Sequence, residues 1–160
     1  MPESTHMAII EHSETLPGTP EVLFDITQDY SMRTAWDPFP ESYEFHNGAK
    51  QAAKGVHLTV RAKNGHRMRV EYVSFNRPRT AAIHMISGPW FIRRFAGTWQ
   101  FVAESNQTTR VSFKYNIVAG PGVLGRLLQP LLNLSFSRHA KQRLLALKSF
   151  VEHRDPHTRT

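Results

Sequence analysis

The sequence TRVSFKYNIVAGPG, residues 109–122, contains the two signals from which the fold can be predicted. Apolar side chains stand at every second position from Val111 to Ile117, and polar side chains stand between them. A period of two is typical of a strand with one buried face and one exposed face. Glycine and proline at residues 120–122 then end the strand.

The apolar period changes to three or four residues after this break, from Val123 to about His153. This period predicts one long amphipathic helix at the end of the chain. Pro130 falls inside it, and a proline removes a backbone hydrogen bond and clashes with the preceding turn. We therefore expect a kink, or a short first helix and a second one starting near Pro130. The apolar stripe consists of Leu124, Leu128, Leu132, Phe136, Ala140, Leu144, Leu147 and Val151.

The whole segment of residues 41–118, which includes this strand, has a period of two, which predicts five or six strands. Residues 56–63 and 67–72 alternate in the same way around Asn64-Gly65, a pair typical of hairpin turns. The later strand that follows Gly88-Pro89 has an unusually aromatic face. That face consists of Phe91, Phe95, Trp99 and Phe101.

The N-terminal part predicts a strand from Ala8 that ends at Leu16-Pro17-Gly18, followed by two short helices. Thr19 is a favourable N-cap and Pro20 suits the first helical position. The second helix, Tyr30 to Trp36, should end before Asp37-Pro38 because proline disfavours a helical residue ahead of it.

This order of elements predicts an α+β fold of one domain over residues 8–153, with disordered tails at 1–7 and 154–160. The sheet has six or seven strands and one apolar face, which only the long helix is available to cover. A helix is about 10 Å wide, so a strongly curved sheet contacts it along one side and leaves space elsewhere. We expect that space to be a ligand cavity.

Several segments resemble the START-like (SRPBCC) superfamily of polyketide cyclase/dehydrase and lipid-transport proteins. Residues 17–26 and 30–38 look like its entrance helices, and residues 140–152 like its last helix. The segment from Gly88-Pro89 to Trp99 and Phe101, ahead of Thr109-Arg-Val, is similar to the coenzyme Q-binding branch. The resemblance implies a helix-grip (Bet v 1-like) fold with a cavity for a lipid, isoprenoid, quinone or polyketide, without implying one chemistry.

Composition excludes several classes of site. The chain has no cysteine, so it has neither disulfides nor thiolate metal sites. It also lacks a His-Glu-x-x-His motif, a phosphate-binding glycine loop and a Gly-x-Ser-x-Gly elbow, and we expect no metal and no cofactor. The N-terminal residues do not read as a signal peptide and no segment is apolar enough to span a bilayer, so we expect a cytoplasmic protein.

The net charge of +7 suits an anionic partner, but the basic residues are scattered, which favours a solvated surface. We expect no specific nucleic-acid binding. The basic outer side of two strands leaves a transient contact with an anionic membrane or a ribosome as a further alternative. That outer face consists of Arg61, Lys63, Arg67 and Arg69, and further basic residues, Arg138, Lys141, Arg143 and Lys148, lie on the last helix.

Candidate ligand contacts follow from the inward phases of the strands and the helix stripe. They are Trp36, Val60, Val70, Tyr72, Ile83, Met85, Phe95, Trp99, Phe113, Tyr115, Leu128 and Leu132. The loops at Gly65 and Gly88–Trp90, with residues 127–132, are expected at the cavity mouth.

Three residues are weak catalytic candidates, Tyr72, Tyr115 and His84. Either tyrosine could orient a ligand oxygen, although we favour core packing with each hydroxyl bonded to backbone or water. His84 has the outward phase, as do Glu71 and Glu104, and Asp37 stands at a helix end. Inward phases are nearly all apolar, and this pattern favours binding over catalysis.

Three functions follow in order of preference. The first is a noncatalytic carrier or sensor of a hydrophobic small molecule. The second is a metal-free cyclase or aromatase acting on a polyketide-like substrate. The third is an interaction module for a ribosome or an anionic membrane.

Overall fold

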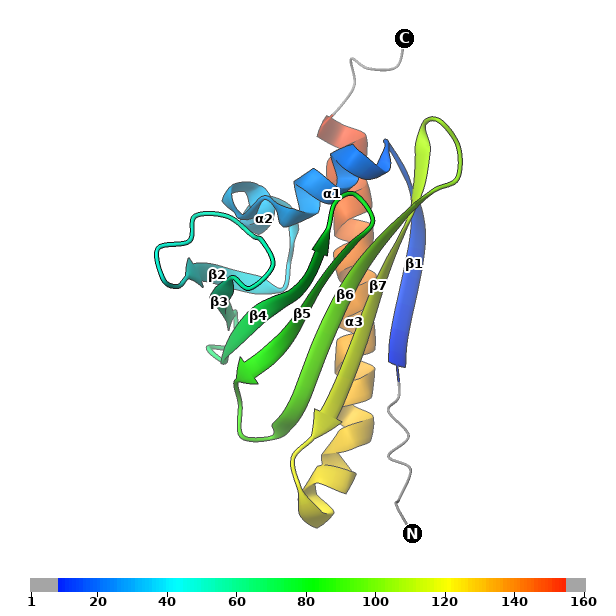
Figure 1. Cartoon of the computed structure of the whole chain (residues 1–160). Helices are drawn as coiled ribbons and strands as arrows, with labels where there is room; N and C mark the ends of the chain where they lie inside the picture. Colours follow the sequence, from blue (N-terminus) through cyan, green and yellow to red (C-terminus); the bar gives the residue numbers. More distant parts are fainter. Residues whose placement is uncertain (1–8, 155–160) are drawn as a thin grey trace.

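The computed structural model describes residues 9–154, in which seven strands form one curved antiparallel sheet and a long helix lies against it (Figure 1). The strand order β1-β7-β6-β5-β4-β3-β2 places the first strand of the chain beside the last. The elements are β1 (Ile9–Pro17), α1 (Pro20–Gln28), α2 (Tyr30–Trp36), β2 (Pro40–Phe45), β3 (His57–Ala62), β4 (Arg67–Asn76), β5 (Thr80–Ser87), β6 (Ile92–Ala103), β7 (Thr108–Ala119) and α3 (Gly122–Arg154). This is the predicted helix-grip architecture.

The two short helices begin where their capping residues predict. The Thr19 hydroxyl accepts a hydrogen bond from the backbone N–H of Val22 at 3.4 Å, and Pro20 is the first residue of α1. Asp29 caps α2, since its carboxylate accepts from the N–H of Ser31 at 3.0 Å. The helix ends at Trp36, ahead of Asp37-Pro38, as expected.

Of the two outcomes expected at Pro130, a kink or a division into two helices, the division is wrong, because α3 is one helix from Gly122 to Arg154. The neighbouring Gln129 anchors this part of the helix to β7. Its side-chain oxygen accepts from the N–H of Ala119 at 2.8 Å, and its nitrogen donates to the carbonyl of Ile117 at 3.0 Å. These bonds hold the turn around the proline against the sheet.

The buried stripe of α3 is shorter than predicted. From Leu132 onward the stripe residues are buried, whereas Leu124 is 50% exposed and Leu128 is only partly buried. Figure 1 shows the reason: the first turns of α3 extend past the end of the sheet. The apolar period therefore continues beyond the surface that can cover it.

Within the described residues, α3 packs mainly on β1 and β7, at one side of the sheet, and contacts α2 near its C-terminal half. It does not pack closely on β3, β4 or β5. The curved sheet thus leaves a space between its inner face and the helix, where the site lies.

The expected tails at residues 1–7 and 155–160 lie outside the described residues, and Arg154 belongs to α3 rather than to a tail. No helix of the described part is long and apolar enough to cross a membrane.

Candidate functional site

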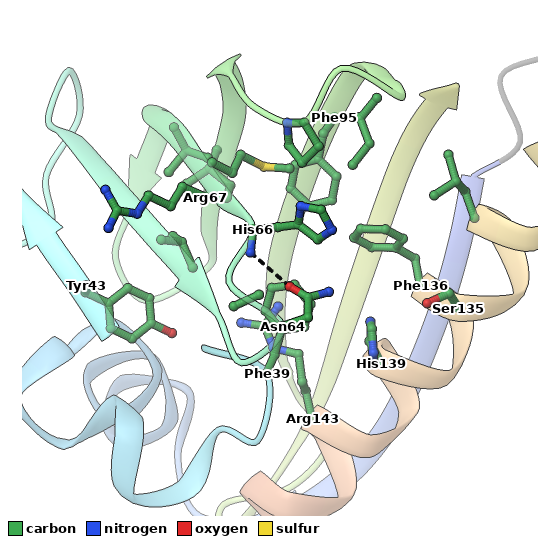
Figure 2. Close-up of a pocket in the computed structure, with 18 of the residues that line it drawn as sticks. Phe39, Tyr43, Asn64, His66, Arg67, Phe95, Ser135, Phe136, His139 and Arg143 are labelled. Carbon is green, nitrogen blue, oxygen red and sulfur yellow. Dashed lines mark hydrogen bonds between the residues drawn. The ribbon is translucent and has the colours of Figure 1, made fainter. Parts of the chain in front are cut away.

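A cavity of about 200 Å³ lies between the inner face of the sheet and α3 (Figure 2). Its walls are mostly apolar side chains of β3 to β6 and α3. They are Val60, Ala62, Met68, Val70, Ile83, Ile92, Phe95, Leu132 and Phe136. The loops 63–66 and 88–91 also border it through Asn64, His66, Pro89 and Phe91, whereas of residues 127–132 only Leu132 does.

Five of the twelve predicted ligand contacts line this cavity, namely Val60, Val70, Ile83, Phe95 and Leu132. Four others, Tyr72, Trp99, Phe113 and Tyr115, surround a smaller adjacent space of about 40 Å³. Both spaces are lined by Tyr30, Arg33, Ile83, Phe95 and Arg143, so they meet at the end of the cavity nearest α2.

The remaining three, Trp36, Met85 and Leu128, line neither space. Trp36 is 6% exposed and packs edge-on against Trp99, with ring centroids 6.2 Å apart. It is therefore part of the core beneath the cavity rather than its wall. Leu128 is partly buried against the core without reaching either space.

The hydroxyl of Tyr72 is bonded to side chains of the protein rather than to the backbone. It donates to the side-chain oxygen of Gln28 at 2.7 Å and is hydrogen-bonded to the hydroxyl of Tyr30. Burial raises the pKa of Tyr72 well above its usual value, and the neighbouring Tyr30 adds to this. Tyr72 is thus a neutral residue at neutral pH that holds α1 and α2 to the sheet.

His84 lies on the outer face of β5, where its side chain is 48% exposed. Its Nε2 is 3.2 Å from the carboxylate of Glu71 on the neighbouring strand. This histidine does not reach the cavity.

The expectation that inward positions are nearly all apolar is wrong at the α2 end of the cavity, where three charged side chains are buried together. Arg33, Asp37 and Arg143 are 4%, 2% and 7% exposed. Arg33 Nε donates to Asp37 Oδ2 at 2.9 Å, and Arg143 Nη2 donates to the same oxygen at 2.7 Å. Arg143 is consequently not part of the solvated basic surface to which its sequence pattern assigned it.

Further hydrogen bonds fix this cluster in the fold. Asp37 Oδ1 accepts from the N–H of Phe39 at 3.0 Å, and Arg33 Nη1 donates to the carbonyl of Thr27 at 2.6 Å. Arg143 Nη1 donates to the hydroxyl of Tyr115 at 2.5 Å. The Tyr115 hydroxyl therefore bonds an arginine side chain rather than the backbone.

The ionisation of the cluster follows from its geometry. Burial by itself raises the pKa of Asp37, but the guanidinium groups of Arg143 and Arg33 outweigh it and hold the pKa below 3.8. Burial opposes the charge of both arginines, and the tyrosine oxygens and Asp37 around them outweigh it, so the pKa of each lies above its usual value. All three groups are charged at neutral pH.

Aromatic faces surround both guanidinium groups. The Arg33 guanidinium lies 5.2 Å from the Trp36 ring centroid and 5.6 Å from that of Trp99. The Arg143 guanidinium lies 4.8 Å from the Phe113 ring centroid. These cation–π contacts reduce the cost of keeping the arginines away from water.

Two polar atoms at the cavity have no hydrogen-bond partner among the described residues, His139 Nδ1 and the hydroxyl of Tyr43. Burial lowers the pKa of His139 below 6.5, and the nearby Arg143 lowers it further. At neutral pH this histidine is therefore uncharged. Figure 2 shows His139 and Arg143 on successive turns of α3, beside the cavity.

The sequence contained a signal for Arg143 that hydrophobicity alone does not reveal. Arg143 stands seven residues after Phe136 and three after Ala140, so it lies on the buried stripe of α3. His139, four residues before it, borders the same stripe. Asp37 carried no such signal, because its burial depends on α2 bringing it beneath α3.

The outer basic face is partly neutralised. Arg61 Nε is 3.3 Å from the carboxylate of Glu41, which balances its charge. Arg69 Nη2 is hydrogen-bonded to the ring of His57 at 3.2 Å, a contact that brings no negative charge. Arg67 borders the cavity. Over residues 9–154 no group of three or more histidine, aspartate or glutamate side chains is placed to hold a metal ion.

Comparison with family models matches residues 7–152 to the family described as polyketide cyclase / dehydrase and lipid transport. The match includes every described strand and both short helices, and all of α3 but its last two residues. No curated protein matches the chain.

Solved structures share the fold at low sequence identity. The Zhui aromatase/cyclase from Streptomyces sp. R1128 has a TM-score of 0.81 and 14% identity, over 95% of this chain and 98% of the other. A START superfamily protein from Mycobacterium smegmatis has a TM-score of 0.70 and 11% identity, over 91% and 97%. Norcoclaurine synthase from Thalictrum flavum, in complex with dopamine and hydroxybenzaldehyde, has a TM-score of 0.67 and 11% identity, over 91% and 87%.

Proposed function

Because this chain belongs to the polyketide cyclase / dehydrase and lipid transport family, we propose that it binds a mostly apolar small molecule in the cavity between the sheet and α3. We propose further that it acts as a noncatalytic carrier or sensor. The observation that carries the proposal is the cavity of about 200 Å³, whose walls along β3 to β6 are mostly apolar.

The composition of these walls suits an apolar ligand. Val60, Val70 and Ile83 come from three neighbouring strands, and Leu132 and Phe136 face them from α3. Moving a methylene group from water into such surroundings contributes about 0.8 kcal/mol. A ligand with several methylene or aromatic groups therefore gains most of its affinity from this part of the cavity.

The ionisable groups give more support to binding than to catalysis. The hydroxyls of Tyr72 and Tyr115 are hydrogen-bonded to protein side chains, and burial raises the pKa of both. Asp37 accepts hydrogen bonds from two guanidinium groups and has a lowered pKa, which makes it a poor proton acceptor.

The proposal can be tested by a substitution that fills the cavity with a tryptophan side chain. The control is the same substitution at an exposed position of the same strand. Ile83→Trp on β5 places an indole in the cavity, whereas Ile86→Trp changes a residue that is 44% exposed. The neutral fluorescent probe N-phenyl-1-naphthylamine should bind the wild type and Ile86→Trp alike and lose at least about tenfold in affinity for Ile83→Trp. Equal binding by Ile83→Trp would place the probe elsewhere and contradict the proposal.

Native mass spectrometry of the purified protein, followed by extraction on denaturation, would identify a ligand that copurifies. The Ile83→Trp protein should carry less of that ligand than Ile86→Trp. A ligand retained equally by both variants would not be bound in this cavity.

His139 gives specific support to a second candidate, a cyclase or aromatase. Its uncharged imidazole has an unpartnered Nδ1 at the cavity, four residues from the Arg143 cation on α3. A neutral base near a cation is an arrangement that removes a proton beside a carbonyl and stabilises the enolate. The structural similarity to an aromatase/cyclase is consistent with this candidate.

For this enzyme, His139→Asn should reduce turnover of a polyketide-like substrate by about 10²-fold or more. Tyr72→Phe and Tyr115→Phe test the tyrosines in the same assay. Turnover that is unchanged in all three variants would exclude these groups from catalysis and favour the carrier.

A further inference from the structure

We propose that the ligand carries one acidic group, a carboxylate or a comparable monoanionic oxygen group, which binds Arg33 and Arg143 at the α2 end of the cavity. This inference rests on the proposed function, since it assigns the chemical class of the molecule bound there. The ligand is then an amphipathic acid, with its apolar part between the sheet and α3.

The first step is the charge of the buried cluster. Two guanidinium groups share one carboxylate, Asp37, which leaves one net positive charge. Among the described residues, no second carboxylate forms an ion pair or hydrogen bond with Arg33 or Arg143. Tyrosine hydroxyls, a carbonyl and aromatic faces stabilise the arginines but carry no negative charge that would balance them.

The second step is the position of that charge. Arg33 and Arg143 are at most 7% exposed, yet both line the cavity. A charge that is removed from water and lacks a counterion is costly, because solvation is lost without a compensating ion pair. An anion in the cavity would supply the missing counterion, and a neutral ligand would not.

The third step is the set of donors that remain available. Arg33 Nε and Nη1 bond Asp37 and the Thr27 carbonyl, whereas its Nη2 makes no hydrogen bond to any described residue. The buried hydroxyl of Tyr43, on the neighbouring β2, also lacks a partner and lines the same cavity. A guanidinium N–H and a phenol O–H are both suitable donors to an oxyanion, and the hydrogen bond from the charged group is the stronger.

A monoanion fits better than a more highly charged group. The cluster has a single excess charge, and Asp37 lies within hydrogen-bond distance of both arginines. A dianion such as a phosphate monoester would bring a second uncompensated charge close to this buried carboxylate. The apolar walls of the cavity, with Val60, Val70 and Leu132, would not solvate it.

The experiment compares three probes of equal chain length by isothermal titration calorimetry on the wild-type chain at neutral pH. These are decanoic acid, its methyl ester and decan-1-ol, and only the acid is ionised. The acid should bind at least about tenfold more tightly than either neutral probe, as expected for a charge-assisted hydrogen bond. Equal or weaker binding of the acid would overturn the inference.

Arg33→Gln tests the residue assignment. In this variant Asp37 keeps its bonds to Arg143, so the remaining pair is neutral and the fold retains a satisfied carboxylate. Decanoate affinity should fall by at least about tenfold, whereas the affinity of the methyl ester should change little. Arg138→Gln, the same change at an exposed position on α3, should bind both probes as the wild type does.

The outcomes separate this inference from the proposed function. Neutral probes that bind as well as the acid leave the cavity proposal standing and refute the acidic ligand. An acid preference that survives in Arg33→Gln also refutes it. If none of the three probes binds, the cavity proposal itself fails, and the acidic ligand with it. The wild-type comparison decides the question even if Arg33→Gln does not fold.

Discussion

Replacing Asp37 with asparagine should destabilise the protein far more than its position at a helix end suggests. The carboxylate is 2% exposed and accepts hydrogen bonds from Arg33 Nε, from Arg143 Nε and Nη2, and from the N–H of Phe39. Asparagine has nearly the same shape but no charge. One of the two carboxylate oxygens is replaced by an amide nitrogen, which is a donor. This nitrogen cannot accept a hydrogen bond from the guanidinium groups that face it.

The magnitude follows from the loss of the one buried counterion. Breaking a buried ion pair by removing one partner costs about 3–5 kcal/mol. With a urea m-value of about 2 kcal/mol per molar, the unfolding midpoint should fall by about 2 M. The total stability of a domain is about 5–15 kcal/mol, so Asp37→Asn should fold with little stability left.

The assay is urea unfolding followed by tryptophan fluorescence, with Asp25→Asn as the matched control. Asp25 also binds an arginine through both carboxylate oxygens, Arg77 at 2.7 and 2.8 Å, but this pair is exposed and should contribute little. If Asp37→Asn and Asp25→Asn unfold at the same urea concentration, the reasoning about buried charge is refuted.

Two further measurements isolate the electrostatic origin of the effect. Adding Arg33→Gln to Asp37→Asn should cost less than Arg33→Gln costs alone, because it removes a cation that has lost its counterion. The folded-state pKa of Asp37 is lowered from 3.8, so its contribution is complete above this value and is lost as pH falls through the folded-state pKa. Stability below pH 3.8 should therefore fall less steeply in Asp37→Asn than in the wild type. Additive costs, or the same acid dependence in both proteins, would contradict this interpretation.

Three other predictions test residues that pack around the cavity or hold α3 and the short helices to the sheet. Gly125→Ala should lower the free energy of unfolding by about 1–3 kcal/mol in thermal denaturation, because an added Cβ would lie 1.5 Å from the carbonyl oxygen of Gly120; unchanged stability would mean that α3 moves freely there. Tyr72→Phe should cost about 1–3 kcal/mol in urea unfolding, since it leaves the buried oxygen of Gln28 without its donor; a neutral effect would mean that water replaces the hydroxyl. The imidazole of His139 should titrate below pH 6.5 by NMR, and its contribution to stability should be complete above 6.5 and lost as pH falls below that value; a midpoint at or above 6.5 would contradict its burial.

The local periodicity of the sequence accounts for most of the fold. The alternation from Val111 to Ile117 gives β7, and the capping residues Thr19 and Pro20 give the start of α1. These predictions succeeded because strand, turn and cap preferences depend on near neighbours in the chain. The division of the last helix at Pro130 failed because bonds from Gln129 to β7 outweigh a local preference.

The sequence predicted an apolar cavity on the inner face of the sheet, but not the full set of residues that line it. Inward phases placed Val60, Val70 and Ile83 on its wall, because a period of two assigns faces reliably within a regular strand. Strand phase also placed Met85 there, and the apolar stripe of the last helix placed Leu128 there, although neither residue lines the cavity. Strand phase and helix stripe identify a face, whereas the depth at which each side chain meets the helix depends on the curvature of the sheet.

The sequence by itself determined the order of elements, the apolar inner face and the long final helix, because these follow from patterns within about ten residues. Only the tertiary structure decided that Arg33, Asp37 and Arg143 are buried together. Asp37 and Arg143 are 106 residues apart in the chain, and their carboxylate and guanidinium are joined by hydrogen bonds of 2.7 to 3.1 Å. Charged residues are usually solvated, and burial becomes favourable for them only when folding supplies partners of opposite charge from distant parts of the chain.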